Sequence, residues 1–162
     1  MDTVTGELRV AGHLDREKTE VYMLNMTVYD QGVNPGQKSY SRLLRVVVLD
    51  ANDNPPTFVK SAFSFFFPEN SKLGTAVVTL NATDPDLGVN GRVTYSLETD
   101  TGGCFALDSE TGSLTVAHHL DREVREFYDL TVKAVDGNPV APLSSYAMVR
   151  VRVVDVNDVA PK

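Results

Sequence analysis

Acidic residues recur in this sequence as closely spaced pairs at the ends of apolar segments. The pairs are Asp15 with Glu17, Asp50 with Asp53, and Asp84 with Asp86. Ca²⁺ takes about six to eight hard oxygen ligands from carboxylates, amide side chains and backbone carbonyls. Spacings of one or two residues let one short loop present several of these oxygens to one ion. The pairs, with the neighbouring amides of Asn52, Asn54 and Asn90, therefore predict a Ca²⁺ site.

Other interpretations of the same acids are weaker. Residues 50–54 taken alone are compatible with a solvated Asx turn before prolines. An EF-hand loop starting at Asp84 would need glycine at its sixth position and glutamate at its twelfth, where this chain has Val89 and Tyr95. Paired carboxylates also serve glycosidases, but these pairs end apolar segments and do not surround a cleft. The chain has no nucleophile–base spacing and no phosphate-binding loop, so we predict that it is not an enzyme.

Composition supports a cation as the partner of these acids. The 162 residues include 15 Lys and Arg against 22 Asp and Glu, a net charge of −7. That balance disfavours nucleic acid and anionic membrane surfaces, which select basic faces. A hydrophobic content of 42% supports a folded core. The chain has one cysteine, Cys104, which excludes a disulfide framework and predicts a free, partly buried thiol; the alternative, an intermolecular disulfide, requires that the thiol be exposed.

An internal repeat divides the chain. Residues 5–11 return as 111–117, residues 14–17 return as 120–123, and residues 50–53 return as 155–158. A period of about 105 residues is the size of one β-sandwich module. We therefore expect residues 1–54 to be the C-terminal half of one repeat and residues 55–162 to be a complete repeat, within a longer protein.

The segments that position the acids have the sequence pattern of β-strands. Apolar residues alternate with polar ones over residues 44–48, 78–82, 93–97, 128–134 and 149–153. No segment has the 3.6-residue period of a helix, and Asn-Gly, Asp-Pro and Asn-Pro-Gly sequences mark turns. The pattern predicts an all-β sandwich of short antiparallel strands. Because an acid follows several of these runs, the carboxylates should gather at the poles of the module.

The aromatic run at residues 63–67 fits the same alternation. It places Phe63, Phe65 and Phe67 on one face, which is expected to be core, and leaves Phe66 on the other. His118 and His119 are adjacent and would point to opposite faces of a strand, so they are not expected to share a metal. Asn25 and Asn81 begin Asn-X-Thr sequons and turn outward, so both are candidate glycosylation sites.

Several motifs together resemble the calcium motifs of cadherin extracellular repeats. They are Leu-Asp-Arg-Glu (14–17), Asp-Ala-Asn-Asp-Asn-Pro-Pro (50–56), Pro-Glu-Asn (68–70), Asp-Pro-Asp-Leu-Gly-Val-Asn (84–90) and Ala-Val-Asp (134–136). They occur in that family's order and cover essentially the whole chain. The resemblance implies a Greek-key, immunoglobulin-like β-sandwich. The chain lacks tryptophan, so it is not the strand-exchanging tip of a short cadherin and is closer to long Fat-type, Dachsous-type or protocadherin-like members.

The resemblance also implies a ligand set at the junction between the two repeats. The implied metal ligands are Asp15, Glu17, Asp50, Ala51, Asn52, Asp53, Asn54, Asp84, Asp86, Asn90 and Asp136. Ala51, Asn54 and Asn90 would bind through backbone carbonyls. The family also uses a glutamate from the first strand of the preceding repeat, which this chain does not contain, so full ion occupancy is not expected.

A second, incomplete set is implied at the far end of the complete repeat. Its members are Glu69, Asp121, Glu123, Asp155, Asn157 and Asp158. Val159 stands where the family usually has a second asparagine, and we expect weak or no Ca²⁺ binding there.

The function that the resemblance implies is calcium-dependent cell–cell adhesion. Ca²⁺ would rigidify the junction between repeats on the extracellular side of the cell membrane, with membrane attachment only through other parts of a parent chain. The partners would be other cadherin ectodomains, homophilic or heterophilic, with no nucleic acid and no small-molecule substrate. The alternatives are a calcium-stiffened spacer without a partner on this piece, and a calcium-independent immunoglobulin-like or fibronectin-like binding module.

Overall fold

The computed structural model describes residues 2–32, 36–99 and 101–155, and these residues form strands and loops only. The prediction of an all-β chain is therefore confirmed. The chain divides into two compact units, Met1–Asp50 and Ala51–Lys162, each described below by itself. No helix in the described part of the chain is long and apolar enough to cross a membrane.

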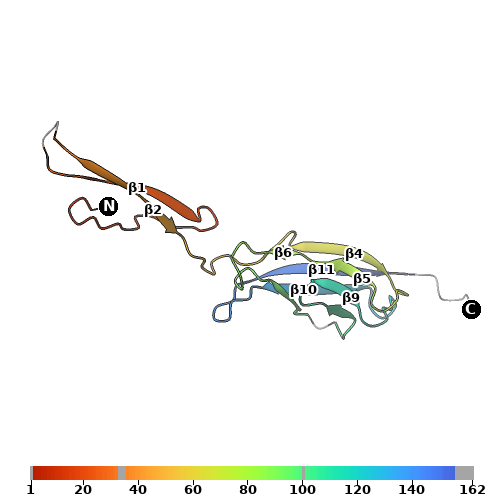
Figure 1. Ribbon diagram of the computed structural model, residues 1–162. Helices are drawn as coiled ribbons and strands as arrows, with labels where there is room; N and C mark the ends of the chain where they lie inside the picture. The colour runs from red at the N-terminus through yellow and green to blue at the C-terminus, as the bar shows by residue number, and fades with distance from the viewer. Residues whose placement is uncertain (1, 33–35, 100, 156–162) are drawn as a thin grey trace, which may run out of the picture. The chain divides into compact units, whose positions relative to one another are not determined.

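The first unit contains one antiparallel hairpin, formed by β1 (Val21–Tyr29) and β2 (Ser39–Val47) (Figure 1). Tyr22 lies across from Val46 and Leu24 across from Leu44, so these apolar side chains share one face. Tyr22, Leu24 and Val46 line a hollow of about 360 Å³ together with residues 8–14. This face is thus apolar but incompletely covered within the unit.

The described residues of the second unit form nine strands in three sheets (Figure 1). The strands are β3 (Thr57–Phe58), β4 (Ala62–Pro68), β5 (Ala76–Thr79), β6 (Ala82–Thr83), β7 (Thr94–Leu97), β8 (Phe105–Leu107), β9 (Ser113–Val116), β10 (Phe127–Val135) and β11 (Ser144–Val154). The sheets have the orders β4-β11-β10-β7, β5-β9-β8 and β3-β6.

The expectation of short antiparallel strands is wrong at two points. β4 pairs with β11 in parallel, from Ala62 beside Met148 to Pro68 beside Val154. A parallel partner needs a long crossover, and here most of the second unit lies between the two strands in sequence. In addition, β10 has 9 residues and β11 has 11, so both are longer than an average strand. In β10 and over most of β11 the alternation of buried and less buried residues continues without a break.

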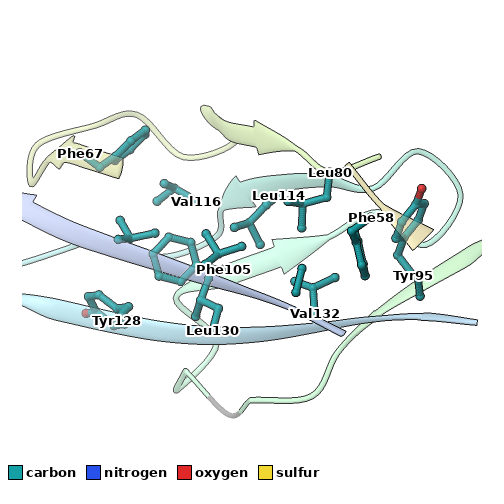
Figure 2. Packing of buried hydrophobic residues seen from close by; sticks show 14 of the residues in the cluster. Phe58, Phe67, Leu80, Tyr95, Phe105, Leu114, Val116, Tyr128, Leu130 and Val132 are labelled. Carbon is teal, nitrogen blue, oxygen red and sulfur yellow. The ribbon is translucent and has the colours of Figure 1, made fainter. Parts of the chain in front are cut away.

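The core of the second unit lies between β10–β11 and the β5-β9-β8 sheet. Figure 2 shows Tyr128, Leu130 and Val132 of β10 directed toward Leu114 and Val116 of β9. All of these side chains are buried. The ring of Phe105 packs edge-on against that of Tyr128, with centroids 5.2 Å apart. Burial of this apolar surface is the main force that holds the strand ends at fixed poles.

The aromatic run in β4 follows the predicted alternation. Phe67 is buried and Phe63 and Phe65 are half-buried against the core, while Phe66 is exposed. Cys104 is a free, half-buried thiol, as predicted. Its Sγ donates to the hydroxyl of Tyr128 at 3.7 Å.

Candidate metal centre

One pole of the second unit gathers carboxylates and amides because four chain segments meet there. β3 and β6 are antiparallel, so the start of β3 and the end of β6 lie together, which brings residues 51–54 near Asp84 and Asp86. β7 and β10 are antiparallel as well, with Thr94 across from Val135. The residue after Val135 is Asp136, so β10 delivers that carboxylate to the same pole.

Asp86 is joined to the segment that precedes β3. Its two carboxylate oxygens accept hydrogen bonds from Asn54, from the side-chain amide at 2.7 Å and from the backbone N–H at 3.3 Å. The backbone N–H of Asp86 donates to Oδ1 of Asp84 at 2.9 Å. Only 6% of Asp86 is exposed. The Asp84 and Asp86 pair is therefore held as a rigid, largely buried group of oxygens.

Asp136 is the most strongly held carboxylate at this pole, with 4% of the residue exposed. Its Oδ2 accepts from the backbone N–H of Leu143 at 2.8 Å and from the amide of Asn52 at 2.9 Å, and its Oδ1 accepts from the N–H of Asn138 at 2.9 Å. Burial raises the pKa of Asp136, but these hydrogen bonds outweigh it and hold the pKa below its ordinary value. The group is thus an anion at neutral pH.

The side chain of Asn52 provides the test of whether a cation fits. Its Nδ2 donates to both Asp136 and the backbone carbonyl of Ala141, each at 2.9 Å, so its two hydrogens are used. Its Oδ1 is buried and accepts no hydrogen bond from any described residue. A buried acceptor without a donor is costly. An oxygen in this state, on a side chain bonded to the anionic carboxylate of Asp136, fits a hard cation such as Ca²⁺.

The remaining residues expected in this set are connected to the same network. Oδ1 of Asp53 accepts from Asn54 at 2.8 Å, and the carbonyl of Ala51 accepts from the N–H of Asp53 at 3.0 Å. The side-chain oxygen of Asn90 accepts from Asn138 at 2.9 Å. Sequence reasoning missed Asn138, although its place two residues after Asp136 in an Asp-Gly-Asn-Pro turn is a signal for it.

The loop that carries Asp84 and Asp86 makes a close backbone approach at Gly91. A methyl group at Gly91 would overlap the backbone carbonyl oxygen of Asp86, and it would come 3.5 Å from that of Asp84. The chain therefore folds back on itself at a distance that only glycine permits. This close approach holds the backbone of the loop against its own acidic end.

The acids of the first unit are held by basic side chains. The guanidinium of Arg16 pairs with Glu17, and its Nε lies 2.7 Å from Oδ1 of Asp50. Oδ2 of Asp15 accepts from Nζ of Lys18 at 2.6 Å, which lowers the pKa of Asp15. Sequence reasoning did not assign a role to Arg16, although it stands inside the Leu-Asp-Arg-Glu motif.

The other pole of the second unit carries a second acidic group. Glu69 follows β4, Asp155 follows β11, and Glu123 precedes β10; their carboxylate oxygens lie within 4.8 Å of one another. Glu69 is buried and accepts from the backbone N–H of Arg122 at 3.0 Å. Asp121 instead accepts from the N–H groups of its own turn and does not belong to this cluster. The predicted members Asn157 and Asp158 lie outside the described residues.

The chain is similar in sequence to one family of known proteins. A family model described as Cadherin domain matches residues 63–154. Protocadherin Fat 1 of Homo sapiens is 44% identical over 162 residues, covering 99% of this chain and 4% of that protein. The Fat-like cadherin-related tumor suppressor homolog of Drosophila melanogaster is 46% identical over 162 residues, covering 99% of this chain and 3% of that protein.

Among solved structures, mouse Cadherin-23 EC22-24 superposes with a TM-score of 0.83 at 38% identity, covering 91% of this chain and 46% of that one. This likeness confirms the β-sandwich fold. The Fat-type and protocadherin-like character expected from the motifs is confirmed by the relatives. The matching family is that of cadherins and not a family of enzymes, in agreement with the prediction that the chain is not an enzyme. The chain belongs to the cadherin family, and its sequence resembles the repeats of the long Fat-type and protocadherin members.

Proposed function

We propose that this chain is part of a calcium-dependent adhesion ectodomain, on the extracellular side of the cell membrane. The observation that carries the proposal is the buried oxygen set of the second unit: Asp136 accepts from Asn52, whose Oδ1 is buried and unsatisfied, and buried Asp86 accepts from Asn54. Ca²⁺ bound there would supply positive charge and satisfy that acceptor. Family membership supports the extracellular placement and the adhesive role.

In this proposal Ca²⁺ also makes the junction between repeats rigid. The resemblance assigns ligands from both sides of the boundary, with Asp15, Glu17 and Asp50 joining the set of the second unit. Like charges about 4 Å apart repel by about 1 kcal/mol even in water. A cation that removes this repulsion links the folding of the acidic segments to its own binding. Without Ca²⁺ the same segments repel one another.

The first unit is, in the same proposal, the second half of a repeat. Its hairpin corresponds to β10–β11, and residues 7–10 correspond to β9. The support is a contrast in burial: 69% of Val10 is exposed, while 1% of its counterpart Val116 is exposed. Leu8 and Leu14 are likewise exposed, and their counterparts Leu114 and Leu120 are buried. The first unit therefore has one side of a sandwich core.

The partners proposed are other cadherin ectodomains, homophilic or heterophilic. Two alternatives make different predictions. A spacer without its own partner would be stiffened by Ca²⁺ but would not self-associate. A calcium-independent immunoglobulin-like or fibronectin-like binding module would have the same stability with Ca²⁺ and with a chelator.

Thermal unfolding of the chain in excess Ca²⁺ and in chelator tests the calcium proposal. We expect Ca²⁺ to raise the melting temperature and the Asp84→Ala/Asp86→Ala variant to lose that rise. An Asp129→Ala/Glu98→Ala variant is the matched control, because it removes two exposed acids remote from the proposed ligand set. Equal melting temperatures of the parent chain with Ca²⁺ and with chelator contradict the proposal. Self-association by sedimentation then separates a homophilic adhesive role from the spacer role.

A further inference from the structure

Two asparagines in Asn-X-Thr sequons face solvent, for the same structural reason. Asn81 lies between β5 and β6, and its neighbours Leu80 and Ala82 are buried, so alternation directs Asn81 outward. Asn25 is exposed in the middle of β1, on the opposite face from Leu24. Neither side-chain amide hydrogen-bonds to another described residue, so both amide nitrogens are accessible in the folded chain.

Both asparagines also lie beside apolar side chains that have no protein cover. Leu43, of which 60% is exposed, lies directly across from Asn25 on β2, and Met23 is exposed two residues away on the same face. The backbone carbonyl of Asn81 accepts from the N–H of Val59 at 3.2 Å, and 72% of Val59 is exposed. Exposed apolar area is unfavourable in water and promotes association.

We propose that Asn25 and Asn81 carry N-linked glycans that cover these apolar side chains. The inference rests on the proposed extracellular placement, since the modification requires passage through the secretory pathway, but it does not depend on Ca²⁺ binding. A sequon supplies the acceptor amide, and the glycan is bulky and soluble. The glycans take the place of a protein partner over the Met23–Leu43 and Val59 surfaces.

The modification is a group transfer with a lipid-linked oligosaccharide diphosphate as co-reactant. A bond forms between Nδ2 of the asparagine and C1 of the first sugar, and the bond between C1 and the diphosphate oxygen breaks. The leaving lipid diphosphate retains the bonding electron pair, and the amide nitrogen loses one proton. Nothing is oxidised or reduced.

Secretion of the full chain from mammalian cells tests occupancy. We expect the intact mass to fall by two glycans on treatment with peptide-N-glycosidase, by one in Asn25→Gln or Asn81→Gln, and by none in the double variant. Thr27→Ala and Thr83→Ala should each remove the same glycan as the corresponding asparagine variant. Asn70→Gln is the control, because Asn70 is exposed but is not in a sequon. A secreted chain without glycans overturns the proposal, and a single-site variant with unchanged mass overturns it for that site.

Fluorescence of an apolar dye tests the covering role. Native deglycosylation of the folded chain should increase dye fluorescence, and Leu43→Ser with Val59→Ser should abolish most of that increase. Phe66 is exposed but has no sequon beside it, so dye bound at Phe66 should give the same fluorescence before and after deglycosylation. Unchanged fluorescence means that the glycans do not cover these surfaces. The calcium-dependent melting measurement does not depend on glycosylation. Failure of the calcium proposal can therefore be distinguished from failure of the glycan proposal.

Discussion

Replacing Asp136 by asparagine is the sharpest test of the pole of the second unit, because the change keeps the shape and removes the charge. The carboxylate accepts three hydrogen bonds, two at Oδ2 and one at Oδ1. If the new carbonyl oxygen takes the place of Oδ2, it keeps the bonds from Leu143 and Asn52. The new amide group then faces the N–H of Asn138, so two donors meet.

The loss can be estimated from these contacts. A hydrogen bond to a charged group contributes about 1.5–3 kcal/mol, and a buried donor left unsatisfied costs about 1–3 kcal/mol. Both figures describe the same N–H group of Asn138, so they are not added together. We expect the free energy of unfolding of the Asp136→Asn variant in chelator to be lower by about 2–3 kcal/mol. A ligand at 100 times its dissociation constant adds about 2.7 kcal/mol to the folded state. The variant should also lose a large part of the calcium increment, which is the rise in the free energy of unfolding caused by excess Ca²⁺.

Urea unfolding of parent and variant, each in chelator and in excess Ca²⁺, measures both quantities. Asp129→Asn is the matched control: Asp129 accepts from Arg150 at 2.6 and 2.9 Å, but the pair is exposed and contributes about 0–1 kcal/mol. A loss below about 0.5 kcal/mol in chelator would refute the hydrogen-bond network as the source of stability. A calcium increment equal to that of the parent would refute Asp136 as a ligand.

Four further measurements follow from the structure. The pKa of Asp136 is lower in the folded chain than in the unfolded chain. Its contribution to the free energy of unfolding is therefore present above the unfolded pKa of about 3.9 and is lost as the pH falls through the folded pKa. In chelator, the free energy of unfolding should fall more steeply below about pH 4, and this fall should be shallower in Asp136→Asn. Gly91→Ala should weaken Ca²⁺ affinity measured by calorimetry, since the methyl group displaces the backbone of Asp86; unchanged affinity would show that the loop relaxes elsewhere. Leu130→Ala should cost about 2–5 kcal/mol in urea unfolding, because Leu130 is fully buried, and a cost near zero would place it outside the core. Burial and the thiol hydrogen bond raise the pKa of Tyr128 to about 12, so its ultraviolet titration should stay incomplete until the chain unfolds in alkali, whereas ionisation near pH 10 in the folded chain would contradict its burial.

Strand identity followed from local sequence. Alternation over residues 128–134 and 149–153 corresponds to β10 and β11, and the aromatic run of β4 has the expected inward and outward faces. Period-two patterning is a property of consecutive residues, so it is visible without long-range contacts. The parallel pairing of β4 with β11 was not predicted, because the sequence pattern of a strand does not name its neighbour.

Part of the candidate metal site followed from motif spacing as well. Asp84 and Asp136 each follow an apolar run and Asp86 is paired with Asp84 by spacing, and the structure brings the three to one pole. The spacing did not indicate that Arg16 would pair with Glu17 and Asp50, or that Asn138 would donate to both Asp136 and Asn90. Arg16 is far in sequence from Asp50, as Asn138 is from Asn90, so these two contacts depend on how the loops fold.

The sequence by itself determined the repeat, the all-β class and the types of oxygen available to a cation, since these depend on composition, period and spacing. Only the tertiary structure decided which of those oxygens are buried and which are already satisfied. The amide of Asn52 shows the difference: its orientation is set by Asp136 and Ala141, 84 and 89 residues away in the chain. Burial and hydrogen bonding are properties of three-dimensional neighbours, and the strand ends supply those neighbours only after the core has packed.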